Sequence, residues 1–269
     1  MSQQQEPSIL LSDGKKKQVL ADLFAQCRAR GTMIFTNEEV SETADRIGFE
    51  NPYDAVNIDQ ISQIPDVMRK ADFTLIHVGE GAYMFVRGLS TAFHEFEPIP
   101  SNCVFMRKYR HGILDELDTS KDDILSVGMN QRILPDFLPD EFAAIPNIYN
   151  TRPTKKSLDY TFNETPIQAA NLQIEMDMAC EYDNCVTIFK GKSVPTPNFP
   201  VHQLFHPWLY FTTLRENGEI ESKGLGCCYL MHFTQGEALV VRLYMYEFGK
   251  KNPASISLKR CAEYRLARP

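Results

Sequence analysis

The spacing of apolar positions in the first fifty residues predicts two helices. Residues 15–30 carry apolar side chains at three-and-four spacing, which predicts an amphipathic helix that Gly31 ends. That stripe consists of Val19, Leu20, Leu23, Phe24 and Cys27. Thr36 followed by Glu39 has the spacing of a capping box, so a second helix is expected to begin there and to end at Gly48.

A pair of strands follows these helices. Short helical segments are predicted between residues 54 and 70, and apolar runs over 73–78 and 82–87 flank a Gly-containing turn. Helices followed by a hairpin are the element order of a winged helix, and any small α+β subdomain is the alternative. We therefore predict a winged-helix-like domain over residues 1–90 and a second domain over residues 91–269.

The second domain contains one helical pattern and several strand patterns. Residues 124–137 are predicted to be helical, and residues 203–210 form a second, apolar-rich helical stretch. Residues 228–248 alternate around Gln235-Gly236 and predict a hairpin. Two further apolar runs, 173–182 and 185–192, flank Asp183-Asn184, a pair suited to a tight turn.

The turn at Asp183-Asn184 sets a register. If these two residues form the loop, Tyr182 faces Cys185, and each step back along the first strand matches one step forward along the second. Asp177 then faces Lys190, and Glu175 faces Lys192. Glu181 shares the face of Glu175 and Asp177, because side chains of a strand alternate. Two acids and two lysines are thus predicted to converge on one patch. The alternative is an ordinary set of cross-strand ion pairs on an exposed sheet face.

Composition narrows the class of protein. The 269 residues are 43% hydrophobic and 23% charged, as in a globular protein with a sizeable core. The net charge of −7 argues against coating nucleic acid by charge alone, but not against binding in a local groove. Seven cysteines without a C-x-x-C pair, and an N-terminus unlike a signal peptide, predict free thiols and a cytoplasmic protein.

Three stretches of the chain resemble a known family. They are Gln173-Ile-Glu-Met-Asp177, Lys190-Gly-Lys192 and Gln203-Leu-Phe-His-Pro207. Together with the runs 126–137 and 151–156, they are similar to type II restriction endonucleases of the PD-(D/E)XK nuclease superfamily. The resemblance covers roughly residues 126 to 210. It implies a mixed α/β (α+β) fold, with a restriction-endonuclease-like central mixed sheet flanked by helices, after the small winged-helix-like domain.

The resemblance also implies a function. A magnesium-dependent, sequence-specific double-stranded DNA endonuclease of a restriction-modification system would hydrolyse phosphodiester bonds, because a hard cation activates water and neutralises the scissile phosphate. Asp177 is the first expected Mg²⁺ ligand, Glu175 the second ligand or a residue that orients water, and the carbonyl of Gly191 a further ligand. Lys192 is expected to hold the attacking water or to stabilise developing negative charge. Gln203 is expected to contact backbone or water.

Contacts with DNA are expected outside this centre. Arg152, Lys155 and Lys156 are the expected phosphate contacts. Asn130, Gln131 and Arg132 carry side chains suited to base edges. Cutting both strands of a symmetric site favours a homodimer. His202 and His206, which flank Gln203, are interpreted as core or helix-surface residues.

Lys190 departs from the family pattern, which has an acid at this position. A lysine there removes a metal ligand and adds positive charge. Three interpretations stay open: Glu175 or Glu181 supplies the carboxylate, the protein has lost cleavage and kept DNA binding, or Lys190 is a change particular to this chain. The principal alternative to the nuclease is therefore a catalytically degenerate DNA-binding protein. An enzyme unrelated to nucleic acid has little support, because the sequence contains no phosphate-binding loop, nucleophile elbow or dinucleotide motif.

Overall fold

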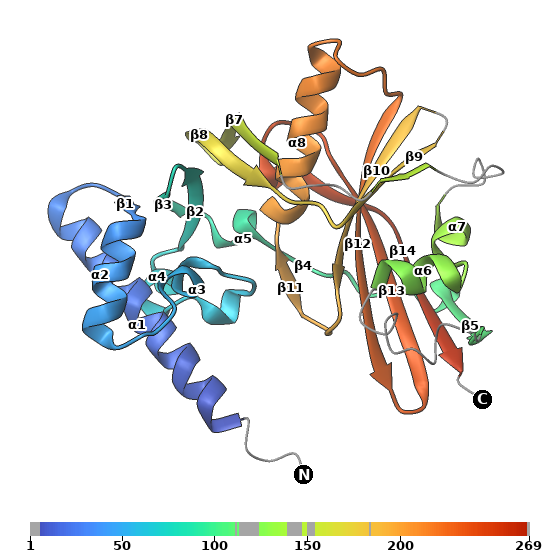
Figure 1. Cartoon of the computed structure of the whole chain (residues 1–269), viewed down its shortest axis with the longest axis horizontal. Coiled ribbons are helices and arrows are strands. Elements are labelled where there is room, and N and C mark those ends of the chain that lie inside the picture. Colours follow the sequence, from blue (N-terminus) through green and yellow to red (C-terminus); the bar gives the residue numbers. More distant parts are fainter. Residues whose placement is uncertain are drawn as a thin grey trace.

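The computed structural model describes residues 6–110, 112, 124–138, 147–149, 154–182 and 184–267. Its elements form an N-terminal helical part and a larger part built on a long twisted sheet (Figure 1). The fold is a mixed α and β fold, as the sequence predicts. In the described part of the chain, no helix is long and apolar enough to cross a membrane.

The N-terminal part comprises helices around a small sheet. Its elements are α1 (Glu6–Arg30), β1 (Ile34–Thr36), α2 (Asn37–Ile47), α3 (Pro52–Val56), the 3₁₀ helix η1 (Ile61–Gln63), α4 (Asp66–Lys70), β2 (Phe73–Gly79) and β3 (Ala82–Arg87). The capping box is confirmed: Thr36 caps the Glu39 N–H, and the Glu39 carboxylate accepts the Thr36 N–H at 2.8 Å. The predicted stripe of α1 is buried in a core with side chains of α2 to β3.

One sheet joins the two parts of the molecule. Its order is β1-β3-β2-β8-β7, in which β7 (Thr154–Phe162) and β8 (Thr165–Ile174) come from the C-terminal part. The junction is close, because a Cβ on Gly79 would lie 1.6 Å from the Ala170 carbonyl oxygen. Only glycine fits this position, where φ is also +88°. The winged-helix-like assignment and the boundary near residue 90 stay predictions.

The larger sheet is mixed and has seven strands. In spatial order they are β5 (Val104–Lys108), β14 (Ile256–Ala267), β13 (Ala238–Phe248), β12 (Gly224–Gln235), β10 (Cys185–Lys192), β9 (Met178–Tyr182) and β6 (Asn147–Tyr149). β10 runs parallel to β12, and β14 parallel to β5, whereas the other pairs are antiparallel. The hairpin predicted over residues 228–248 is β12–β13.

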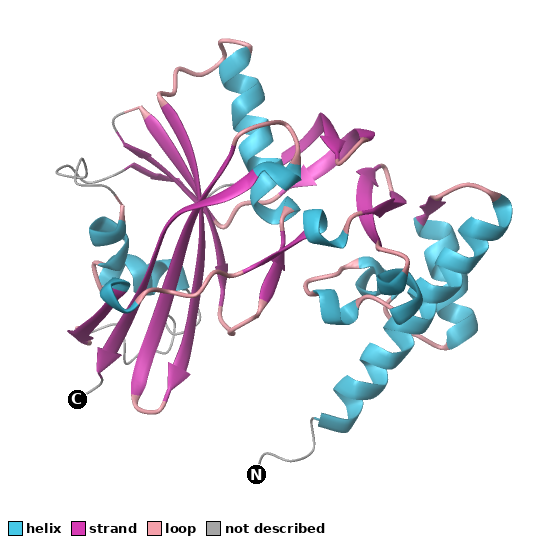
Figure 2. Cartoon of the chain, turned by 180° about the vertical axis from the view of Figure 1, so that it is seen from behind, coloured by secondary structure: helices cyan, strands magenta, loops and turns pink. Residues whose placement is uncertain are grey.

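Helices cover both faces of this sheet (Figure 2). On one face, α8 (His202–Glu216) packs on the side of Ile188 and Tyr229. On the other, α6 (Ile124–Asn130) and α7 (Ile133–Phe137) pack on the side of Phe189 and Leu230. The single helix predicted over 124–137 is wrong, because Arg132 has a left-handed φ of +54° that interrupts it.

Short elements complete the fold. They are α5 (Leu89–Ala92), β4 (Phe93–Glu95), η2 (Ser101–Cys103), β11 (Asn198–Pro200) and η4 (Pro253–Ser255). β4 pairs with β11 and so ties the segment after the N-terminal part to the segment before α8.

The register predicted for the central hairpin is confirmed from Cys185 opposite Tyr182 to Phe189 opposite Met178. Asn184 has the positive φ that a tight turn requires, whereas residue 183 lies outside the described residues. The predicted single strand over 173–182 is wrong. β8 ends at Ile174 in the five-stranded sheet, and β9 begins at Met178 in the seven-stranded sheet.

Candidate functional site

Asp177 lies where the chain crosses from one sheet to the other, opposite the end of β10. Its backbone N–H donates to the Phe189 carbonyl at 3.2 Å, which continues the hairpin ladder by one residue. Lys190 Nζ donates to Asp177 Oδ1 at 2.9 Å, and the Gly191 N–H donates to Oδ2 at 2.7 Å. Asp177 and Lys190 therefore meet as the sequence predicts, and both carboxylate oxygens accept a hydrogen bond from the protein.

Lys192 pairs with an acid that sequence reasoning missed. Its Nζ lies 3.3 Å from Oδ2 of Asp59, in the loop between α3 and η1. Gln203 Nε2 donates to Asp59 Oδ1 at 3.4 Å. The loop is fixed because Gln63 Oε1 accepts the Asp59 N–H at 2.7 Å. No local pattern marks Asp59, since only the tertiary contact between the N-terminal part and α8 brings it here.

The predicted pairing of Glu175 with Lys192 is wrong. Because β8 leaves the hairpin at Ile174, Glu175 has no strand partner there, and its Oε1 instead accepts from Gln173 Nε2 at 2.5 Å. Glu181 lies four residues along the chain from Asp177, which is about 13 Å in an extended strand. Glu181 is therefore too distant to complete a metal site at Asp177.

These side chains do not fit the Mg²⁺ site that the resemblance implies. Mg²⁺ needs oxygen ligands in near-octahedral geometry. Here each of two carboxylates, Asp177 and Asp59, is matched by one ammonium group, Lys190 and Lys192. Within the described ranges, no group of three or more His, Cys, Asp or Glu side chains could hold a metal ion. The ammonium group of Lys190 lies beside Asp177, at 2.9 Å from its Oδ1.

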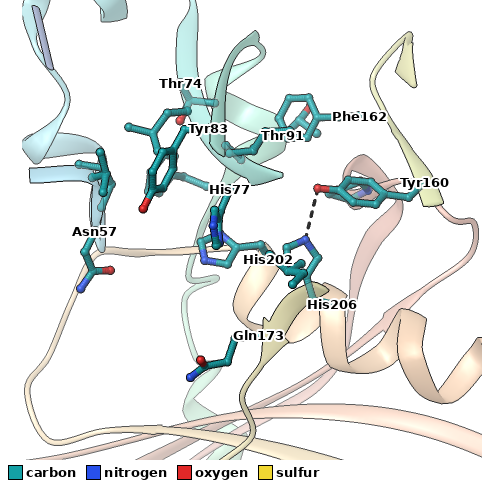
Figure 3. A pocket seen from close by; sticks show the side chains of 18 of the residues that line it. Asn57, Thr74, His77, Tyr83, Thr91, Tyr160, Phe162, Gln173, His202 and His206 are labelled. Atoms are coloured by element: carbon teal, nitrogen blue, oxygen red, sulfur yellow. Dashed lines mark hydrogen bonds between the residues drawn. The ribbon is translucent and has the colours of Figure 1, made fainter. Parts of the chain in front are cut away.

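The two ion pairs, Lys190 with Asp177 and Lys192 with Asp59, are called the lysine cluster below. Three histidines border a pocket next to this cluster (Figure 3). His77 comes from β2, and His202 and His206 come from the first turns of α8. His206 is buried and its Nε2 lies 3.3 Å from the hydroxyl of Tyr160, so its interpretation as a core residue fits. His202 is exposed, and its ring faces the pocket.

The pKa values of the pocket histidines are lowered, which favours their neutral form. Burial lowers the pKa of His77 and holds the pKa of His206 well below its usual range. Desolvation of the ring where it faces the pocket lowers the pKa of His202 to about 4, although the charge of Asp59 opposes this shift. The charge of Lys190 lowers the same pKa further, which shows how near the pocket lies to the lysines.

Two of the three side chains expected to contact phosphate lie on β7, next to β8. Lys155 and Lys156 are exposed on β7, and Lys155 is opposite Gln173 of β8. Lys156 Nζ lies 5.6 Å from the centre of the Tyr210 ring. Arg152 lies outside the described residues.

The side chains expected to contact bases are not at this site. Asn130 and Arg132 are exposed, but they lie at and just after the end of α6, on the sheet face opposite α8. Gln131 is buried, and its amide exchanges hydrogen bonds of 2.8 and 2.9 Å with the backbone of Arg110. Its polar atoms are therefore committed to the fold and not available to a base.

The chain belongs to the family described as Domain of unknown function (DUF6997), which matches residues 89–265. The matched region contains both lysines of the cluster and Asp177, whereas Asp59 and His77 precede it. No curated protein and no solved structure matches the chain.

Proposed function

We propose that this protein binds duplex DNA through a restriction-endonuclease-like core that does not use a divalent metal to cut it. The observation that carries the proposal is the contact of 2.9 Å between Lys190 Nζ and Asp177 Oδ1. The ammonium group of Lys190 pairs with the carboxylate that restriction endonucleases of the PD-(D/E)XK superfamily would use to hold Mg²⁺. The resemblance at residues 173–207 supports DNA as the partner.

The charges around Asp177 do not select a cation. Its two acids and two lysines sum to zero, whereas two acids and one lysine in the restriction-endonuclease pattern sum to −1, which favours a cation. Lys155 adds a positive charge beside Gln173 on the neighbouring strand. Phosphate groups of DNA are recognised mainly by such lysine contacts, and binding then weakens steeply with salt.

A plasmid experiment tests this proposal. We expect the full-length protein to retard plasmid DNA and leave it intact, with or without Mg²⁺. Lys155→Ala should weaken binding across all sequences and reduce the salt slope by about 1. Lys250→Ala, an exposed lysine after β13, is the matched control and should leave both unchanged. Discrete Mg²⁺-dependent fragments would refute the loss of cleavage, and absence of retardation would refute DNA binding.

A magnesium-dependent endonuclease remains the second proposal, because Asp59 brings a second carboxylate to the cluster. Burial raises the pKa of Tyr229, and the charges of both Asp59 and Asp177 raise it further, so the two carboxylates act on one hydroxyl. Cleavage through them requires both lysines to release their acids. In that case Asp59→Asn and Asp177→Asn should each abolish the fragments while DNA retardation persists. Light scattering would show whether the cutting species is the expected homodimer.

A further inference from the structure

The pocket beside the lysine cluster lies between the N-terminal part and the C-terminal part. Its cavity has a volume of about 260 Å³. Figure 3 shows Tyr83 and His77 on one side, Tyr160 on the other, and Asn57 and Gln173 at its margin. Pockets for drug-sized ligands measure about 300–1,000 Å³, so this one suits a single small ring system.

The walls offer flat aromatic surfaces. The rings of His77 and Tyr83 stack with their centroids 4.9 Å apart and an interplanar angle of 28°. Tyr160 and Phe162 line the cavity from β7. Because the pKa values of His77 and His206 are lowered by burial, these rings favour their neutral form, which suits an uncharged ring.

Its polar groups suit the edge of a heterocycle. A neutral histidine provides one donor and one acceptor, and an amide provides both. His202, Asn57 and Gln173 contribute such groups, and Asn and Gln pair with base edges by two hydrogen bonds. His206 is committed to Tyr160 at 3.3 Å, as the dashed line in Figure 3 shows. One N–H of the Gln173 amide is held by Glu175 at 2.5 Å, which leaves the second N–H and the carbonyl oxygen of that amide for a ligand.

The ion pairs of Lys190 and Lys192 lie at the adjoining site. Asn57 and Ile58 line the pocket, and the next residue, Asp59, pairs with Lys192. His202 lines the pocket as well, and the following residue, Gln203, bonds the same Asp59. The charge of Lys190 acts on His202 of the pocket wall, so the ammonium groups and their acids adjoin the pocket.

We propose that this pocket binds a nucleobase whose attached phosphate lies toward Lys190 and Lys192. The base is either extruded from duplex DNA or carried by a free mononucleotide. The first source rests on the DNA binding proposed above, and the second does not. Extruded bases are held by stacking on aromatic side chains and by hydrogen bonds to their polar edge, which are the groups that this cavity supplies.

Two measurements on the full-length protein separate the sources. In the first, a duplex carries 2-aminopurine opposite cytosine, since a mismatched base costs least to extrude. We expect its fluorescence to rise on binding. In the second, AMP, GMP, CMP and TMP are titrated by calorimetry. Asn57→Ala and Gln173→Ala should each weaken the positive signal about 3- to 10-fold, the effect of one lost hydrogen bond. Gln168→Ala, an exposed glutamine on the same strand as Gln173, is the matched control.

Each outcome decides the proposal. A fluorescence rise that both pocket variants reduce supports the extruded base, and nucleotide binding that both reduce supports the free nucleotide. Either signal unchanged in both variants would place the base elsewhere and overturn the proposal. If neither signal appears, the proposal is also overturned. Gel retardation of the same duplex then shows separately whether the protein binds DNA.

Discussion

Replacing Lys190 by glutamate is the sharpest test of the proposal that this lysine takes the place of a metal-binding acid. Two charges 2.9 Å apart attract by roughly 6 kcal/mol at an effective dielectric constant of about 20. The side chains of Lys190 and Asp177 are 22% and 33% exposed, so desolvation and solvent screening offset most of this attraction. We expect Lys190→Glu to cost about 1–3 kcal/mol without metal, because two carboxylates then face each other.

Mg²⁺ should restore part of the lost free energy of unfolding in the Lys190→Glu variant. A metal present at tenfold its Kd adds about 1.4 kcal/mol to the free energy of unfolding. At about 2–4 °C per kcal/mol, the variant should melt about 2–12 °C below the wild type in EDTA and regain roughly 3–6 °C with Mg²⁺. The wild type should not respond. The assay is thermal unfolding followed by circular dichroism.

Two controls define what would refute this reasoning. Lys190→Gln removes the positive charge without adding an acid, so it should be destabilised and insensitive to Mg²⁺. Lys250→Glu makes the same charge reversal at an exposed position and should behave as the wild type. If the wild type gains as much stability from Mg²⁺ as Lys190→Glu does, the wild-type cluster already holds the metal and the argument from the lysine fails.

Three further predictions concern stability. Thr36→Ala should cost about 1 kcal/mol and lower the Tm by about 2–4 °C, because it removes the hydroxyl that caps α2; Thr36→Ser should retain most of it. Gly79→Ala should break the contact of β2 with β8, because the new methyl group meets the Ala170 carbonyl, and amide exchange in both strands should become faster. Gly31→Ala is the control: it has a similar φ of +73° but open space around it, so it should cost only the backbone strain. The Tm should fall as the pH drops below about 6.5, because the unfolded state then binds a proton that buried His206 refuses; the fall should be smaller in His206→Phe, and an equal fall would contradict this assignment.

Local patterns predicted local structure well. The spacing of Thr36 and Glu39 fixed the start of α2, because a capping box involves only neighbouring residues. The turn at Asn184 likewise predicted which residues of β9 and β10 face each other, and so the approach of Asp177 to Lys190. These features depend on short-range geometry that residue types report directly.

Non-local contacts were beyond such patterns. The alternation through Ile174 and Met178 is continuous, yet the two residues belong to different sheets, since pairing partners decide which sheet a strand joins. Asp59 is an ordinary loop aspartate in the sequence, and only the packing of the N-terminal part against α8 brings it to Lys192. The pocket was missed for the same reason, because its walls come from β2, β7 and α8.

The five-stranded sheet limits which N-terminal segments can precede the region that the family model matches. The family match begins at residue 89, between β3 and β7, so it divides a sheet whose strands hydrogen-bond across that point. A chain that begins at residue 89 would lose the bridge between Gly79 and Ala170 and would leave Lys192 without its acid. Residues 1–88 should therefore be exchangeable for the corresponding segment of another protein only if that segment has a glycine in place of Gly79 and an aspartate in place of Asp59.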